Sequence, residues 1–283
     1  MDRELVLFVL AAVLAGVAVP FGALAASLLA IDHDVAHSGR TLERLALRRL
    51  LLPLSPALVA LAALLGWALV EPDDAERVPW AVFLMAMPVL FVWLRAALRA
   101  ARALQAPPIL SAATVGLFHA RVVVGSDFRA KLDPPAFEAA LAHERAHARH
   151  RDPLRIWLSQ IATDLQWPLP SARDRFEYWL FALELARDDE ARTSIDGADL
   201  AAAVLVAARV EQPAPFAFAG IASAGTAMRV RVERLLAPVP PDSREGPALL
   251  VGLALVLGAL VVALLLGAGF GELLIRQVLG WGR

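Results

Sequence analysis

Two histidines and a glutamate occur in the pattern H-E-x-x-H, at His143, Glu144 and His147. Residues four apart on an α-helix share a face and lie about 6 Å apart along its axis, so two imidazoles at this spacing can bind one tetrahedral ion. Glu144 would then lie beside the ion, where its carboxylate can take a proton from a water molecule that Zn²⁺ activates. The chain contains only six histidines, which makes a chance match rare, and the motif therefore predicts a zinc peptidase.

The residues around the motif predict the helix that it requires. Asp133 followed by Pro134 is typical of a helix start, and Pro153 indicates an end near Asp152. His150 lies seven residues beyond the first histidine of the motif, which is about 10 Å along a regular helix. Because no glycine interrupts the helix to bring it closer, we expect His150 to lie at the surface or behind the site rather than on the metal.

A second helix, predicted over Arg173–Arg192, offers the third ligand. Glu184 and Asp188 are four residues apart, so one carboxylate can bind the ion while the other orients a ligand histidine. Glu177 lies on the same face one heptad earlier and is the alternative candidate for the metal ligand. We expect Asp189 and Glu190 of this helix to lie on an ordinary solvated surface.

Three segments together resemble a known family: ALAHERAHARHRDPL, an apolar stretch ending in QWPLP, and ALELARDDEA. They are similar to the sensor-transducer membrane metallopeptidases whose best-known members respond to beta-lactam antibiotics, and the resemblance covers most of the chain. It favours Glu184 over Glu177. It implies Glu144 as the general base, Asp188 as the carboxylate behind the site, and one Zn²⁺ ion held by His143, His147 and Glu184.

The chain also departs from that family. His150 occupies a position that is usually basic, and Arg187 replaces a usual Cys or Ala. Beta-lactam sensors carry a large penicillin-binding domain after the last span, whereas about a dozen residues follow Gly271. We therefore expect no direct beta-lactam sensing, and a separate sensor protein could supply the signal. The prenyl-protein protease and heat-shock membrane protease families share the H-E-x-x-H and E-x-x-x-D pattern and remain alternatives.

The composition predicts a mainly α-helical, polytopic membrane protein. Hydrophobic residues make up 59% of the 283 positions. Four apolar blocks contain no charged residue or histidine and predict about four transmembrane helices: Leu5–Ile31, Leu50–Val70, Val78–Leu94 and Gly246–Gly271. The first block is longer than a signal-peptide core, so we favour a span there.

These blocks divide the chain into three regions. Residues 1–94 would carry three spans (about 5–31, 50–70 and 78–94), residues 95–245 a gluzincin-like α+β metallopeptidase domain, and residues 246–283 the fourth span and a short tail. Arginines cluster in the loop expected over 32–49, after the first span, and again after the third span, while the short turn expected over 71–77, which would lie outside, is acidic. The positive-inside rule then predicts a multi-pass protein of the inner (plasma) membrane with its N- and C-termini outside and its peptidase domain in the cytoplasm.

A β-strand is predicted at Ala120–Gly125 (ARVVVG), within a hairpin or meander over 115–132. In peptidases with this pair of helices, an edge strand commonly receives the substrate as an added strand, which would place Val123 and Val124 against it. A buried structural strand is an equal alternative. His119 could stabilise an oxyanion, although a lone histidine beside a strand is more often structural. Further helices are predicted at 154–169, 198–209 and 227–236.

Several classes of function are disfavoured. The chain has no cysteine, which excludes disulfides, thiolate metal sites and a cysteine nucleophile. A net charge of −1 argues against direct nucleic-acid binding. The expected partners are the lipid bilayer and a protein substrate, which by resemblance would be a transcriptional repressor or the chain itself. A non-catalytic membrane regulator with a structural zinc site is the main rival, but it would not need Glu144. We expect His33 and His37 to form a surface cluster rather than a metal site.

Overall fold

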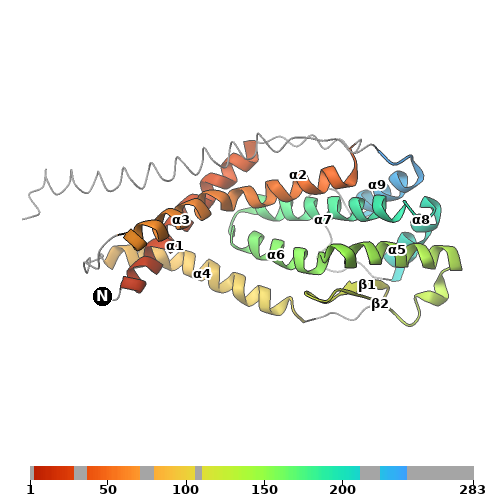
Figure 1. Ribbon diagram of the computed structural model, residues 1–283, viewed down its shortest axis with the longest axis horizontal. Helices are drawn as coiled ribbons and strands as arrows, with labels where there is room; N and C mark the ends of the chain where they lie inside the picture. Colours follow the sequence, from red (N-terminus) through yellow and green to blue (C-terminus); the bar gives the residue numbers. More distant parts are fainter. Residues whose placement is uncertain (1–2, 29–36, 71–79, 106–109, 211–223, 241–283) are drawn as a thin grey trace, which may run out of the picture.

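The structure is a computed structural model, and the residues that it describes are 3–28, 37–70, 80–105, 110–210 and 224–240. The described chain is mainly helical, with one short β-hairpin. Three long helices, α1 (Arg3–Leu28), α3 (Ser55–Val70) and α4 (Trp80–Arg102), gather at one end of the molecule, and the remaining elements form the other end (Figure 1).

Helix α1, helix α4 and the continuous helical segment that leads into α3 carry the candidate membrane spans. Within the described residues, stretches long and apolar enough to cross a bilayer are Leu7–Leu24, Gly39–Ala62 and Phe83–Arg102. Helix α1 packs against both α3 and α4 through small side chains that let the backbones approach closely, among them Ala12, Ala15, Ala18, Ala57 and Ala86. Three of the four predicted blocks thus fall on these helices, and the fourth, Gly246–Gly271, lies outside the described residues.

Two boundaries differ from those expected from the sequence. Helix α4 continues past Leu94 to Arg102, so the predicted domain boundary falls inside it. The arginine-rich segment before the second span is not a simple loop but helix α2 (Gly39–Leu51), which continues through a 3₁₀ turn, η1 (Leu52–Leu54), into α3. This continuity is the reason that the second apolar stretch begins earlier than predicted.

Helix α2 packs along α7 (Pro170–Ala191) and forms the main core with it. Leu42, Ala46 and Leu50 recur every four residues on one face of α2, and they meet Trp179 and Leu183 of α7. At the start of α2, a Cβ atom added to Gly39 would lie 2.5 Å from the backbone of α7, so only glycine allows this approach. The α2–α7 pair fixes α7, which carries acidic residues of the site.

Helix α5 (Pro134–His150) begins as the sequence predicts. The side chain of Asp133 accepts a hydrogen bond from the backbone N–H of Ala136, and proline occupies the first turn. The helix ends at Arg151, whose φ of 52° is left-handed, and Pro153 lies in the first turn of α6 (Asp152–Asp164). The predicted helix over 154–169 is shorter than expected, since α6 ends at Asp164, before Pro168, and Pro170 already begins α7.

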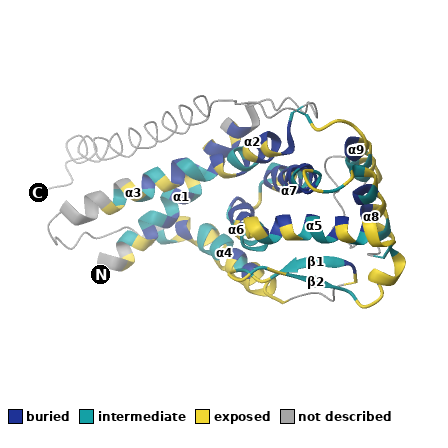
Figure 2. Ribbon diagram, turned by 45° about the vertical axis from the view of Figure 1, so that its right-hand side comes forward, coloured by how far each residue is buried: buried dark blue, intermediate teal, exposed yellow. Residues whose placement is uncertain are grey.

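The hairpin consists of β1 (Ala112–Val115) and β2 (Arg121–Val124), paired antiparallel with Ala112 opposite Val124. It begins earlier than the predicted 115–132, and a 3₁₀ turn, η2 (Arg129–Lys131), follows it. Strand β1 lies between β2 and α5 in both ribbon views (Figures 1 and 2). Helix α8 (Gly197–Val210) packs against α5 and the hairpin, and α9 (Ala224–Leu236) packs against α8 and α7, with both helices near their predicted positions.

Candidate metal centre

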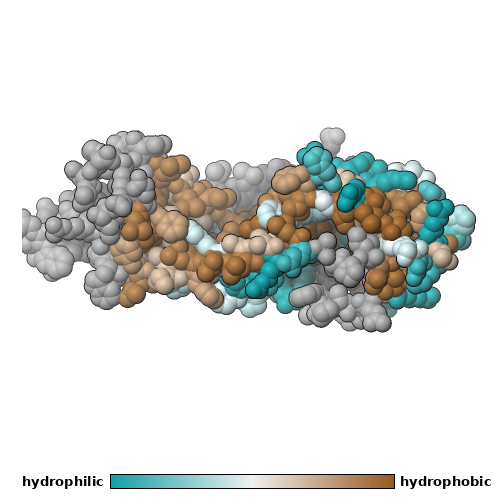
Figure 3. All heavy atoms as spheres, turned by 90° about the horizontal axis from the view of Figure 1, so that it is seen from below, coloured by the Kyte–Doolittle hydropathy of each residue, from teal (hydrophilic) through white to brown (hydrophobic). Residues whose placement is uncertain are grey.

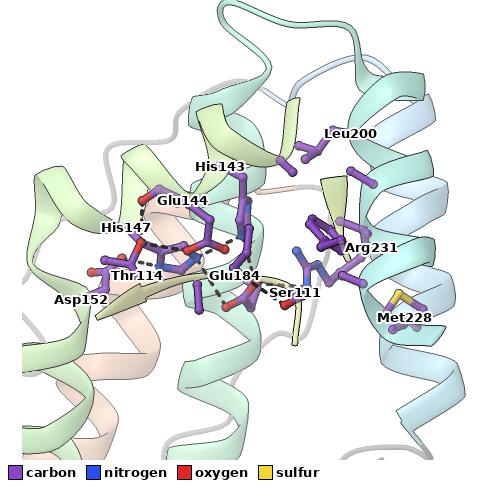
Figure 4. A pocket seen from close by; sticks show the side chains of 18 of the residues that line it. Ser111, Thr114, His143, Glu144, His147, Asp152, Glu184, Leu200, Met228 and Arg231 are labelled. Carbon is purple, nitrogen blue, oxygen red and sulfur yellow. Dashed lines mark hydrogen bonds and ion pairs between the residues drawn. The ribbon is translucent and has the colours of Figure 1, made fainter. Parts of the chain in front are cut away.

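Helices α5 and α7 bring together the two histidines of the motif and Glu184 (Figure 4). The Nε2 atoms of His143 and His147 are 3.1 Å apart. Oε2 of Glu184 lies 3.4 Å from Nε2 of His143, and its Oε1 lies 3.6 Å from Nε2 of His147. The sequence predicts these three residues as ligands, and the structure places one ligand atom from each within 4.8 Å of the others.

The donor set fits a metal ion. Two imidazoles and a carboxylate are typical zinc ligands, and three protein ligands leave a position free for water or substrate. Both histidines are buried, whereas the side chain of Glu184 is 31% exposed, so the group opens to one side. Two histidines and a glutamate from facing helices could therefore hold one ion.

Each imidazole has a buried carboxylate beside its other ring nitrogen. Nδ1 of His147 lies 2.9 Å from Oδ2 of Asp152, the first residue of α6. Nδ1 of His143 lies 3.0 Å from Oδ1 of Asp188 on α7, at an angle outside that of a well-formed hydrogen bond. Because a carboxylate can only accept, these contacts favour the tautomer that carries its proton on Nδ1 and leaves Nε2 free for a metal.

The carboxylates also make this a suitable place for a cation. Burial alone would lower the pKa of His143, but Asp188 and Glu184 outweigh it and raise the pKa to about 10. The negative field that favours a proton between these groups also favours a metal ion there.

Asp152 is held by arginines on its far side. Nε and Nη2 of Arg187 donate to its two oxygens at 2.5 and 3.0 Å, and Arg155 donates to Oδ1 at 2.8 Å. Although burial raises the pKa of Asp152, His147 and Arg187 lower it below its usual range. Arg187 is buried, and it acts on the carboxylate that contacts His147.

Arg231 of α9 joins the two acidic residues of α7. Its Nη1 lies 3.1 Å from Oε2 of Glu184, while Nε and Nη2 each donate to Asp188 at 2.9 Å. Burial raises the pKa of Glu184, but Arg231 and the imidazole of His147 outweigh it and lower the pKa. Arg231 thus keeps both carboxylates ionised and fixes their orientation.

Glu144 faces β1. The hydroxyl of Thr114 lies 2.8 Å from Oε2 of Glu144 and 2.7 Å from its backbone carbonyl oxygen, so its single hydrogen can be donated to either. Burial raises the pKa of Glu144, and the neighbouring imidazoles and Thr114 offset part of that effect. A raised pKa brings a carboxylate closer to the range in which it exchanges protons near neutrality.

A cavity of about 330 Å³ opens onto these groups. The metal-binding group and Glu144 line one side of it, and residues 111–114 at the start of the hairpin line another. The rest is largely apolar and comes from α8 and α9, with Leu200, Val204 and Met228 among its residues. The cavity can therefore accept a chain with a hydrophobic side group.

Other predicted residues lie away from this cavity. His119 is exposed in the hairpin turn, and Val123 and Val124 lie on β2, so none of the three is among its lining residues. His150 contacts Glu190 at 2.7 Å and is 40% exposed. Glu177, the competitor of Glu184, pairs with Arg173 at 2.8 Å. The expectation that Asp189 is solvated is wrong, because it is buried and pairs with Arg234 of α9.

Sequence reasoning missed Thr114, Asp152 and Arg231 as residues of the site. Asp152 could have been identified from the sequence, because it lies five residues after His147 and directly before Pro153, where a new helix is expected to begin. Thr114 and Arg231 reach the site only through tertiary packing, 30 residues from Glu144 and 43 residues from Asp188 along the chain.

Comparisons of the chain with protein-family models, curated proteins and solved structures find no match.

Proposed function

We propose that this protein is an integral membrane endopeptidase that depends on zinc. The observation that carries the proposal is the position of Glu144, a partly buried carboxylate that shares a cavity with the two histidines and Glu184. A structural metal site would have no use for such a base, whereas peptide hydrolysis requires one.

His143, His147 and Glu184 would hold the ion, with Asp152 and Asp188 orienting the imidazoles. A zinc ion held by these residues would polarise a peptide carbonyl and lower the pKa of a bound water molecule. Glu144 takes the proton from the attacking water and then gives it to the leaving amine. Thr114, donating to Oε2 of Glu144, orients the carboxylate for both transfers.

The substrate would bind as an extended chain along β1. One edge of β1 pairs with β2. Ala112, Ala113 and Thr114 of β1 line the cavity, and we propose that its other edge faces the substrate. This second edge pairs with no other strand among the described residues, and backbone pairing with it would hold a peptide extended beside His143 and Glu144. The strand proposed to receive the substrate is thus β1, whereas the sequence alone suggests β2.

The protein would act at the plasma membrane with this site in the cytoplasm, which is supported by its three candidate spans and by the arginines near their ends. By the resemblance of its motifs, its substrate would be a cytoplasmic regulator such as a transcriptional repressor, or the chain itself.

The test uses the full chain purified in detergent with zinc and incubated with an unstructured protein such as casein. We expect the wild type to bind one zinc ion per chain and to cleave the substrate. His143→Ala should lose both properties, and Glu144→Gln should lose only cleavage. Glu138→Gln, exposed on the same helix, is the matched control and should behave as the wild type. Equal cleavage by wild type and Glu144→Gln would refute the proposal.

A further inference from the structure

Two cavities meet between the candidate spans and the other helices, away from the metal centre. One has a volume of about 470 Å³ and is bounded by α1, α3 and α4, and the other, of about 490 Å³, lies beside the C-terminal half of α4. They share Trp167, Pro168 and Leu169, which connect α6 to α7. One ligand could therefore occupy both.

The first cavity is lined mainly by apolar side chains. Gln166 is the one lining residue with a side-chain amide, and the protein satisfies both of its groups. Its Nε2 donates to the carbonyl oxygens of Leu50 and Ala162, each at 3.0 Å, and its Oε1 accepts from Arg175 at 2.7 Å. The remaining lining is almost entirely aliphatic or aromatic, including Val19, Leu61 and Val92. A hydrocarbon chain suits such a space, and a polar molecule does not.

The second cavity carries a surplus of positive charge. Arg95 and Arg99 of α4 both pair with Asp164, at 3.1 and 2.8 Å, so two guanidinium groups share one carboxylate. Arg173 and Glu177 of the same cavity neutralise each other at 2.8 Å. The lining therefore has a net charge of one positive unit, which complements a ligand with one negative charge.

The boundary between the cavities has the character of a membrane interface. Trp167 is 43% exposed, its ring lies 5.2 Å from the guanidinium carbon of Arg95, and it meets Phe91 edge to face. Tryptophan and arginine at the end of a span are typical of the lipid headgroup region. Seen from below, the surface along α4 changes from hydrophobic to hydrophilic towards its C-terminal end (Figure 3).

We propose that this pair of cavities binds one anionic phospholipid. An acyl chain occupies the apolar cavity between α1, α3 and α4, and the phosphate binds Arg95 and Arg99. Because these arginines lie on a span while Asp164 ends α6, the lipid would connect the membrane helices to the rest of the protein. The site does not depend on the proposed peptidase activity.

The test measures which lipids the full chain retains. Protein in nanodiscs with equal amounts of phosphatidylglycerol and phosphatidylethanolamine is released into the gas phase, and bound lipids are identified by native mass spectrometry. We expect the wild type to prefer phosphatidylglycerol by on the order of tenfold, since each arginine near a headgroup contributes about 1 kcal/mol. Equal retention of the two lipids would refute an anionic site.

Variants test each half of the site. Arg95→Gln/Arg99→Gln/Asp164→Asn should abolish the preference without leaving a buried charge unpaired. Arg102→Gln, exposed on the same helix, lowers the net charge equally and should keep the preference. Asp164→Asn alone should strengthen retention, because it frees both guanidinium groups.

Val92→Trp should exclude lipids of either kind by filling the apolar cavity. Normal retention by that variant, or a preference that survives in the triple variant, would contradict the proposal. So would a cross-link from a cysteine at position 92 to one within 246–271, because the chain itself would then occupy the cavity.

Discussion

Nδ1 of His147 donates to Oδ2 of Asp152 across 2.9 Å, and Asp152 is in turn bound by Arg187. The left-handed Arg151 makes this contact possible, because it ends α5 and turns the next residue back towards the helix. A ligand histidine held in this way keeps one tautomer and one ring orientation before any ion binds.

Asp152→Asn should therefore weaken zinc binding about 10- to 100-fold, because the neutral amide no longer holds the Nδ1 proton as strongly. Competition with a chromogenic chelator measures the affinity. Asp127→Asn, an exposed position, serves as the control. An unchanged affinity in Asp152→Asn would show that this carboxylate does not orient His147.

Arg231→Gln should destabilise the zinc-free protein by about 3 kcal/mol, because Asp188 and Glu184 lose their cation. Zinc should restore much of this loss, since the ion supplies the missing positive charge. The rise in Tm on adding zinc should thus be larger in the variant than in the wild type. Arg229→Gln, two residues earlier and 76% exposed, should change neither value. A smaller rise in Arg231→Gln would contradict the role given to Arg231.

Glu190 links α7 to α5 through Arg149 and His150. Burial raises the pKa of Glu190, but these partners outweigh it and lower the pKa below its usual value of 4.5. Because the pKa of Glu190 is lower in the folded state than in the unfolded state, the ionised carboxylate stabilises the folded protein fully above the usual pKa of 4.5. This stabilisation is lost as the pH falls through the folded-state pKa. Glu190→Gln should cost up to about 1 kcal/mol at neutral pH and nothing in strong acid. A cost that does not depend on pH would exclude the ionic contribution.

The cytoplasmic position of the site can be tested by labelling, since the chain has no cysteine of its own. His150→Cys is exposed on α5 and should resist a membrane-impermeant maleimide in intact cells, but react after the cells are lysed. Asp73→Cys, in the acidic segment predicted to lie outside, should react in both cases. Labelling of position 150 in intact cells would overturn the proposed orientation.

Local patterns in the sequence predict much of this structure. Helix α5 begins with its Asp133 cap as predicted, and the spacing of the motif gives the pair of imidazoles. Helix α2 was predicted as a loop because its arginines indicate a membrane-flanking segment, although Leu42, Ala46 and Leu50 carry the period of a buried helix face. Their partners lie on α7, more than 100 residues later in the chain.

Contacts made by tertiary packing could not be predicted. Arg231 and Thr114 reach the site from α9 and β1, and no pattern near either residue indicates that role. The strand beside the cavity is β1, because the hairpin starts at Ala112 and β2 pairs with it on the far side from α5. The sequence predicts which side chains can bind a metal and which of them share a helix face. It does not predict the order in which helices and strands surround a cavity.

The most direct test of peptidase function is zinc content and turnover measured on the same preparation of Glu144→Gln and wild type. We expect equal zinc content, at one ion per chain, and a fall in kcat on the order of 10²- to 10⁴-fold in the variant, as follows when a general base is removed. Equal turnover in the two proteins, or no cleavage by zinc-loaded wild type of any tested protein or of itself, would contradict the proposed function.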